Sequence, residues 1–339
     1  MTSTSEVIVS SKFVPMMMVD GVLNIRKVAG WTSHDVVARL RRSLGGVKVG
    51  HAGTLDPAAT GVLPLLIGRG TRIAEYLLDW DKEYRAVLRL GETTDTLDAT
   101  GAVLVRRPII GLTDDIILAA ISRFKGRIEQ VPPMYSAVKI AGVPLYKAAR
   151  EGRVVDRAAR VVTILHIEVE RIDRTDISIR VVCSKGTYIR TLCADIGRFL
   201  GVGGHLLALE RTRVGPLTVD RAATIDDFEA SLSIDRWSAC FLSLDAALQS
   251  LPACIVDDAT AHRVLHGVAV PRNSVLTWEP QPEQIDAPGR RGIRIRDQGG
   301  RLLAIGRWPD DRMTTGAGCS HPPIAVEKVL MSEETVNCG

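Results

Sequence analysis

Apolar positions along the chain switch repeatedly between the spacing of helices and the spacing of strands. Residues 33–44 and 113–124 have apolar side chains at helical spacing behind Ser33 and Thr113, which predicts two helices capped by these residues. A short helix is predicted over 71–78 and a longer one over 187–200. Residues 82–91, 161–169 and 177–183 alternate like strands. Helices and strands mix without a regular βαβ rhythm, so the pattern favours an α+β fold.

Glycine and proline divide the chain into larger parts. Residues 50–64 contain three glycines and two prolines, which predicts a structured loop rather than a helix or strand. A break near 246–254 separates a domain at 20–250 from a small β-rich domain at 251–312. Residues 1–19 are expected to form a flexible tail, and residues 313–339 a partly disordered one.

Composition narrows the function classes only slightly. The 339 residues are 46% hydrophobic and 24% charged, as in ordinary globular proteins, and the net charge of +4 permits a polyanionic partner without requiring one. Six cysteines without a C-x-x-C pair suggest a reducing compartment. No apolar run approaches the ~18 residues that span a bilayer, so we expect a cytoplasmic protein that does not bind membranes.

Three polar residues lie where chemistry is conceivable, although a structural role also explains each one. Asp56 precedes Pro57 in the glycine-rich loop, where a carboxylate is either a turn-former or a nucleophile, and the turn is the commoner case. Arg190 lies near a predicted helix N-terminus, which disfavours a cation, so it is a candidate for pairing with a carboxylate or phosphate. Tyr84 begins the apolar face of its strand, and its residue type and position predict a tyrosine at the edge of the hydrophobic core.

Other charged groups support weaker hypotheses. The segment from Arg26 to Lys48 contains six basic residues and one acidic residue. These residues form either a surface that binds the phosphates of a nucleic acid or a solvent-exposed helix face. Asp95 and Asp98 follow a strand in a threonine-rich turn and are expected to stabilise that turn. His262 and His266 are four residues apart, as zinc ligands can be, but no third ligand is evident and we predict no metal site.

Five long motifs, taken together, resemble the TruB-type pseudouridine synthases in order and spacing, over about residues 20–310. They are GWTSHDVV at 30–37, KVGHAGTLDPAATGVLPLLIG at 48–68, DKEYRAVLRLGETTDTLDATG at 81–101, VPPMYSAVKIAGVPLYKAAREG at 131–152 and CSKGTYIRTLCADIG at 183–197. The resemblance implies a pseudouridine synthase fold, with a mixed, mainly antiparallel sheet flanked by helices. It also implies an RNA-clamping insertion at 131–160 and a PUA-like C-terminal RNA-binding domain.

The resemblance also implies roles for single residues. Asp56 matches the catalytic aspartate, Tyr84 the tyrosine that stacks on the target base, and Arg190 the arginine that pairs with the aspartate. The residues matching substrate contacts are His51, Asp98, Lys185, Tyr188 and Leu209.

The implied activity is isomerisation of uridine 55 in the T-arm loop of tRNA, with the base flipped out of its stack. The reaction needs no redox step or external group, so no cofactor is expected, and we expect a monomer without an obligate protein partner. Arginine beside the aspartate is expected to lower the carboxyl pKa by ~1–3 units. Two alternatives are an RNA-binding or RNA-folding module without chemistry and an RNA-guided pseudouridine synthase.

Overall fold

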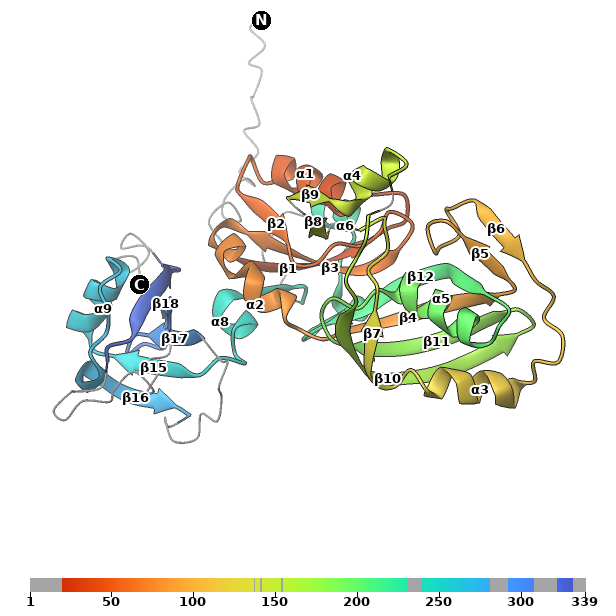
Figure 1. Ribbon diagram of the computed structural model, residues 1–339. Helices are drawn as coiled ribbons and strands as arrows, with labels where there is room; N and C mark the ends of the chain where they lie inside the picture. The colour runs from red at the N-terminus through yellow and green to blue at the C-terminus, as the bar shows by residue number, and fades with distance from the viewer. Residues whose placement is uncertain are drawn as a thin grey trace, which may run out of the picture. The chain divides into compact units, whose positions relative to one another are not determined.

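The computed structural model of the chain describes residues 20–136, 138–140, 142–153, 155–230, 239–280, 292–307 and 322–331 (Figure 1). The predicted tail at 1–19, and residues 313–321 and 332–339 of the predicted C-terminal tail, lie outside these residues. The chain forms two compact units. Of the described residues, one unit contains Leu23–Leu65 and those from Leu77 to Cys240, and the other contains residues 20–22, Leu66–Tyr76 and those from Phe241 onward.

A ten-stranded sheet has the strand order β14-β1-β3-β12-β4-β11-β10-β7, with β13 paired to β12 and β2 paired to β3. Pairing is antiparallel at every step from β12 to β7, whereas β12 and β3 are parallel. The predicted α+β class with a mixed, mainly antiparallel sheet is therefore confirmed. The strands are β1 (Gly21–Lys27), β2 (Val49–His51), β3 (Thr60–Ile67), β4 (Lys82–Leu90), β7 (Gly126–Gln130), β10 (Arg160–Asp173), β11 (Asp176–Cys183), β12 (Gly204–Val214), β13 (Leu217–Thr218) and β14 (Phe241–Ser243).

Alternation of buried and accessible residues explains the central strands. Along β4 every second residue from Lys82 to Leu90 is buried, and β11 repeats this pattern up to Cys183, as the sequence predicted. The prediction of a loop over the whole of 50–64 is wrong at both ends, because β2 reaches His51 and β3 begins at Thr60. From Gly61 onward β3 is continuously buried, so its apolar run forms a central strand despite Pro64.

Two helices cover one face of the sheet. α3 (Asp114–Ser122) packs on β10, and α5 (Ile189–Phe199) packs on β12 and β4 (Figure 1). Their apolar faces, with Ile117 and Leu192 among them, join the side chains of β4 and β11 in one hydrophobic core. The predicted cap at Thr113 is confirmed, since its hydroxyl accepts a hydrogen bond from the backbone N–H of Ile116.

Three predicted helix boundaries are wrong. α1 (Ser33–Ser43) is capped by Thr32 rather than Ser33, because Thr32 and Asp35 form a reciprocal capping box. The segment predicted as a helix from Thr71 is a 3-10 turn (Gly68–Ile73) followed by α2 (Ala74–Leu78). α5 starts at Ile189, two residues after the predicted Thr187, with Tyr188 as its cap.

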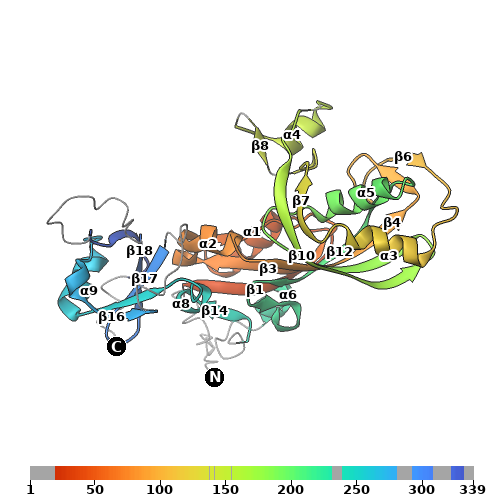
Figure 2. The ribbon, with the colours of Figure 1, turned by 60° about the horizontal axis from the view of Figure 1, so that its bottom comes forward.

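The segment 131–160 leaves the sheet and returns to it. Gln130 at the end of β7 pairs directly with Arg160 at the start of β10, so the two ends of the segment meet. Between them lie β8 (Lys139–Ile140), β9 (Val143–Pro144) and α4 (Leu145–Arg150), which extend away from the sheet (Figure 2). A further hairpin, β5 (Glu92–Thr94) with β6 (Val103–Arg106), follows β4.

A five-stranded sheet with the order β16-β15-β17-β18-β19 forms the core of the second unit. Its last strand lies beyond residue 312, so the predicted end of the small β-rich domain is too early. The helices and strands described in the second unit are α8 (Leu244–Ala247), β15 (Ala253–Val256), α9 (Asp258–Leu265), β16 (Val275–Glu279), β17 (Gly292–Arg296), β18 (Leu302–Arg307) and β19 (Ala325–Val329). The first unit also contains α6 (Ile225–Ala230).

Candidate active site

The loop between β2 and β3 displays Asp56 and is held by hydrogen bonds at each carbonyl from Gly53 to Pro57. Ser33 Oγ accepts from the backbone N–H of Leu55 at 3.0 Å and donates to its carbonyl at 3.3 Å. The backbone N–H of Ala59 donates to the carbonyl of Asp56 at 3.1 Å. The remaining donors are Lys27 Nζ and the N–H of Gly30 to Pro57, and Arg211 to Gly53 and Thr54. A loop with its carbonyls paired in this way holds its side chains in place before substrate arrives.

Asp56 and Arg190 form a two-point ion pair across this loop and α5. Arg190 Nε lies 2.9 Å from Asp56 Oδ2, and its Nη2 donates to Oδ1 at 3.1 Å. The arginine side chain is only 5% exposed, whereas the aspartate side chain is 38% exposed. The predicted pairing of Arg190 with an anion is confirmed, and the carboxylate is the member that faces the solvent-accessible side.

Arg190 also links the loop to two neighbouring segments. Its Nη2 donates to the carbonyl of Tyr135 at 2.7 Å, at the base of the 131–160 insertion, and its Nη1 donates to the carbonyl of Thr96 at 3.3 Å. Asp98 Oδ2 lies 3.7 Å from the same guanidinium. The arginine is therefore oriented by bonds from several directions, which a flexible lysine could not reproduce.

The pKa of Asp56 is raised above its usual range, mainly because of burial, and the charge of Asp98 adds to the rise. Arg190 and Lys27 oppose this shift but do not reverse it. The expectation of a net lowering is therefore wrong. It considered the guanidinium alone and not the desolvation that the surrounding protein imposes on the carboxylate.

A pocket of about 550 Å³ opens beside this ion pair. Six of the eight predicted site residues line it: Asp56, Tyr84, Lys185, Tyr188, Arg190 and Leu209. Tyr84 on β4 is 8% exposed, and burial raises the pKa of its phenol. Lys185 forms an ion pair with Asp79, and both side chains are well exposed. Segments far apart in the sequence thus converge on one cavity.

The other two predicted residues, His51 and Asp98, are not among the lining residues of this pocket. Asp98 Oδ1 accepts hydrogen bonds within its own turn, from Thr96 Oγ1 at 2.7 Å and from the N–H of Thr100 at 2.9 Å. The predicted turn-stabilising role of Asp98 is confirmed. His51 packs edge-on to His34 with ring centroids 5.9 Å apart, and burial lowers its pKa. Within the described part of the chain, its Nδ1 has no hydrogen-bond partner.

Four further residues lie near the carboxylate, and the sequence reasoning gave none of them a role there; it counted Lys27 only as part of a basic face. Lys27 is 1% exposed and donates to three carbonyls, and burial lowers its pKa to about 8. Lys82 lines the pocket, and its pKa is also lowered to about 8, chiefly by burial. Arg211 and Ser136 line the pocket too, and the buried Ser136 hydroxyl has no partner among the described residues. For the three basic residues, the sequence signal was a cation at a position that would otherwise be apolar; Ser136 had no such signal.

The arrangement places a carboxylate at the edge of a pocket that is lined by aromatic, apolar and basic side chains. Within the described ranges there is no group of three His, Cys, Asp or Glu side chains that could hold a metal ion, and His262 on α9 and His266 at its C-terminal cap belong to no such group. A cavity of about 750 Å³ elsewhere in the first unit is lined by Asp95, Glu129 and Asp195 with two arginines, and it lacks both Asp56 and Tyr84. No helix in the described part of the chain is long and apolar enough to cross a membrane.

Comparison with solved structures identifies the wider class. The fold is similar to a chain in the "Crystal Structure of a Cbf5-Nop10-Gar1 Complex", with a TM-score of 0.71 and 30% identity, over 93% of this chain and 86% of that one. It is also similar to a chain in the "Structure of H/ACA RNP bound to a substrate RNA containing 2'-deoxyuridine", with a TM-score of 0.67 and 27% identity over 92% and 85%. The family model "TruB family pseudouridylate synthase (N terminal domain)" matches residues 41–189. The fold and the family match together define a pseudouridine synthase.

Sequence comparison identifies the family within that class. The "tRNA pseudouridylate synthase B C-terminal domain" model matches residues 190–251. The chain is 46% identical over 298 residues to tRNA pseudouridine synthase B of Ralstonia pickettii (strain 12J), covering 87% of this chain and 92% of that protein. It is 48% identical over 250 residues to the Aromatoleum aromaticum protein of the same name, covering 74% and 80%. The chain belongs to the TruB family of pseudouridine synthases, and the resemblance seen in its motifs is confirmed.

Proposed function

We propose that this protein isomerises uridine 55 in the T-arm loop of tRNA to pseudouridine, using Asp56 as the catalytic carboxylate. The observation that carries the proposal is the two-point Asp56–Arg190 contact at a pocket that Tyr84 and Leu209 also line. The relatives with 43–48% identity are named tRNA pseudouridine synthase B, which favours tRNA as the substrate.

The proposed reaction rearranges bonds within one nucleotide. The N1–C1′ bond breaks and its electron pair stays with the uracil, which turns in the pocket and rebonds to C1′ through C5. The C5 proton then leaves and N1 gains a proton, so atoms and electrons balance without a co-reactant. Asp56 can assist by attacking C1′, by attacking uracil C6 or by taking a ribose proton, and each route requires its carboxylate form.

The pocket offers groups for each part of the flipped nucleotide. Tyr84 and Leu209 line the pocket, where the ring would stack on the flipped base, the phenol would be a candidate to take the C5 proton, and Leu209 would provide an apolar contact. Extrusion of a base costs a few kcal/mol, which stacking and backbone contacts offset. Lys185 and Tyr188 lie at the pocket, where they suit the ribose-phosphate backbone. We assign His51 and Asp98 to contacts with the RNA outside the pocket.

The insertion at 131–160 and the small β-rich unit are proposed as further RNA contacts. Arg153 and Arg160 are exposed on the insertion, whereas Arg157 donates to the carbonyl of Pro132. Arg153→Ala and Arg160→Ala should each weaken tRNA binding and reduce the salt slope of log K by about 1. An unchanged slope in filter-binding titrations would show that this insertion does not contact phosphates. The unit formed by β15–β19 would bind the acceptor arm as a PUA-like domain.

Stand-alone action is favoured over RNA-guided action. The sequence identity to proteins named tRNA pseudouridine synthase B is 43–48%, against 30% to the chain in the Cbf5-Nop10-Gar1 complex. The convergence of Asp56, Tyr84 and Arg190 on one pocket also argues against an RNA-binding module without chemistry.

The direct test uses purified protein and unmodified tRNA transcripts, with pseudouridine mapped by carbodiimide primer extension. A single stop at position 55 is expected, without any added guide RNA or protein. A transcript with cytidine at position 55 is the matched control and should give no stop. Modification at another position, or only with a guide RNA, would contradict the proposed substrate.

A further inference from the structure

Arg211 on β12 is one of the largest fully buried side chains, at 1% exposed. Its guanidinium donates to three carbonyls: Nε to Val62 at 2.8 Å, Nη2 to Gly53 at 3.1 Å and Nη1 to Thr54 at 3.4 Å. Gly53 and Thr54 precede the catalytic aspartate in the loop. Arg211 therefore ties the start of that loop to β12 and to the first residues of β3.

The charge of Arg211 lacks the partner that buried arginines usually have. Within the described residues, no carboxylate lies within ion-pair distance of it, in contrast to Arg190. A buried cation without a counter-ion is unfavourable, and a well-packed apolar side chain would commonly serve stability as well or better. Stability alone therefore does not explain why an arginine stands at this position. Because Arg211 lines the pocket, a role in the function of the site is the alternative explanation.

Tyr84 is the residue directly opposite Arg211 in the pairing of β12 with β4. The buried phenol has a raised pKa, and the charge of Arg211 and a hydrogen bond with it act in the opposite direction. Leu209, two residues before Arg211, lines the same pocket. One guanidinium thus contacts both the loop that carries the carboxylate and the aromatic residue that faces the base.

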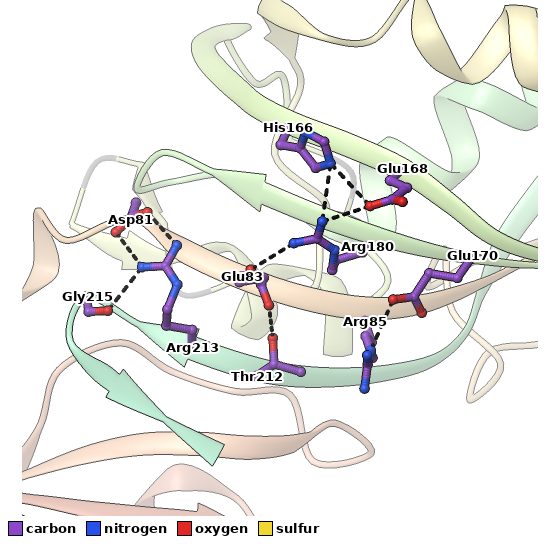
Figure 3. A network of polar contacts seen from close by, with 10 residues as sticks. All are labelled: Asp81, Glu83, Arg85, His166, Glu168, Glu170, Arg180, Thr212, Arg213 and Gly215. Atoms are coloured by element: carbon purple, nitrogen blue, oxygen red, sulfur yellow. Dashed lines mark hydrogen bonds and ion pairs between the residues drawn. The ribbon is translucent and has the colours of Figure 1, made fainter. Parts of the chain in front are cut away.

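Arg213 provides a natural comparison on the same strand. Residues two apart normally face the same side of a sheet, but the β12–β4 register shifts between Arg211 and Arg213. Arg213 instead contacts Asp81, at 3.0 Å and 2.7 Å, beside Thr212 and Glu83 (Figure 3). The two arginines share their strand and sequence context but not their surroundings.

We propose that Arg211 is a positioning residue, which holds the Gly53–Thr54 segment and the Tyr84 phenol together so that Asp56 and Tyr84 meet the target uridine as one unit. The inference rests on the proposed function and adds a residue to its machinery. Arg211 exchanges no proton and forms no covalent bond; it acts through the placement of the other two.

The test compares Arg211→Lys with Arg213→Lys on the full-length protein and unmodified tRNA. A lysine keeps the charge but carries all its donors on one nitrogen, so it cannot reproduce the three bonds that Arg211 makes from Nε, Nη1 and Nη2 to carbonyls on two segments. Misplacement of about 1 Å can cost ~100-fold in rate. We therefore expect a single-turnover rate about 100-fold lower for Arg211→Lys, with tRNA Kd within about 3-fold and the folded state retained. Arg213→Lys should remain within about 3-fold of wild type in both rate and Kd.

A second variant, Arg211→Gln, keeps two N–H donors without the charge and should show the same loss of rate with retained binding. A near wild-type rate for Arg211→Lys, or a loss confined to tRNA affinity, would overturn the inference. Loss of the folded state in both Arg211 variants would also overturn it, because the residue would then hold the fold rather than the site. A wild-type protein that forms no pseudouridine would instead reject the proposed function.

Discussion

The two faces of the sheet around β4, β11 and β12 carry the same residue types in different surroundings. On the outer face, Arg180 contacts Glu83 and Glu168, and Arg85 contacts Glu170 (Figure 3). On the pocket face, Arg190 contacts Asp56 and Arg211 contacts backbone carbonyls. The side chain of Arg85 is 62% exposed, whereas that of Arg190 is 5% exposed.

This difference shows why the number of ion pairs near a site does not predict how strongly a substitution will affect it. Exposed pairs are screened by water and contribute about 0–1 kcal/mol each, and many can rearrange without loss. The enclosed groups of the pocket face share donors and acceptors, so changing one leaves others without partners. We therefore expect substitutions to have large effects on the pocket face and small effects on the outer face.

The largest effect is expected from Asp56→Asn, which keeps the size of the side chain and removes its charge. Turnover should fall by at least about 10,000-fold, since catalytic nucleophiles and bases elsewhere show losses of this order. Single-turnover assays with unmodified tRNA measure this, with filter binding as the control for retained affinity. A rate near that of wild type would exclude Asp56 as the catalytic carboxylate.

Arg190→Lys should have the next largest effect, of about 100-fold in the single-turnover rate. A lysine cannot contact both oxygens of Asp56 while bonding to the carbonyl of Tyr135. Thermal unfolding should show a lower Tm, because a buried planar donor is replaced by one with fewer hydrogen bonds. Wild-type kinetics in this variant would show that the two-point contact is not needed.

A smaller effect, on the pH profile, is expected from Asp98→Asn. Its carboxylate raises the pKa of Asp56, so removing that charge should lower the Asp56 pKa. In the proposed function activity requires ionised Asp56 and should rise with pH through this pKa, so the acid limb of kcat/KM should move to lower pH. Lys27→Met is the opposite test, because its charge lowers the Asp56 pKa and its loss should move the limb upward. Limbs that do not move in either variant would contradict this electrostatic account.

The smallest effect is expected from Arg85→Gln on the outer face. Arg85 follows Tyr84 directly in the sequence, but its ion pair with Glu170 is largely exposed. The free energy of unfolding should change by no more than about 1 kcal/mol, and turnover should stay within about 2-fold of wild type. Denaturant titration and the tRNA assay check both values. A loss comparable to that of Arg190→Lys would remove the distinction between the two faces.

Local patterns were sufficient for much of the fold. The alternation along β4 and β11 and the helical spacing behind Thr113 gave correct elements, because burial on one face imposes a regular period. The prediction failed where packing against distant segments determines the secondary structure. The glycine and proline residues of β3 suggested a loop, although this strand lies in the centre of the sheet. Ser33 was interpreted as a helix cap, whereas its hydroxyl holds the backbone of Leu55.

For the site, too, the sequence predicted one part and the structure was needed for the rest. The motifs around Asp56, Tyr84 and Arg190 identified the family from the sequence alone, and the geometry then showed that the three side chains converge on one pocket. Lys27 was counted with a basic face, although it is buried, and Arg211 was given no role, because the sequence does not show which cation bonds to carbonyls of a distant segment. The direction of the Asp56 pKa shift also depended on burial, which a single sequence does not display.

The sequence by itself determined the family and most of the element types, and it supplied the candidate site residues, because those depend on local periodicity and on long motifs. Only the tertiary structure decided which side of the sheet each arginine faces. Arg211 and Arg213 are two residues apart and would share a face on a regular strand. The register shift between them places one beside the catalytic loop and the other beside Asp81, and this choice depends on the pairing of β12 with β4.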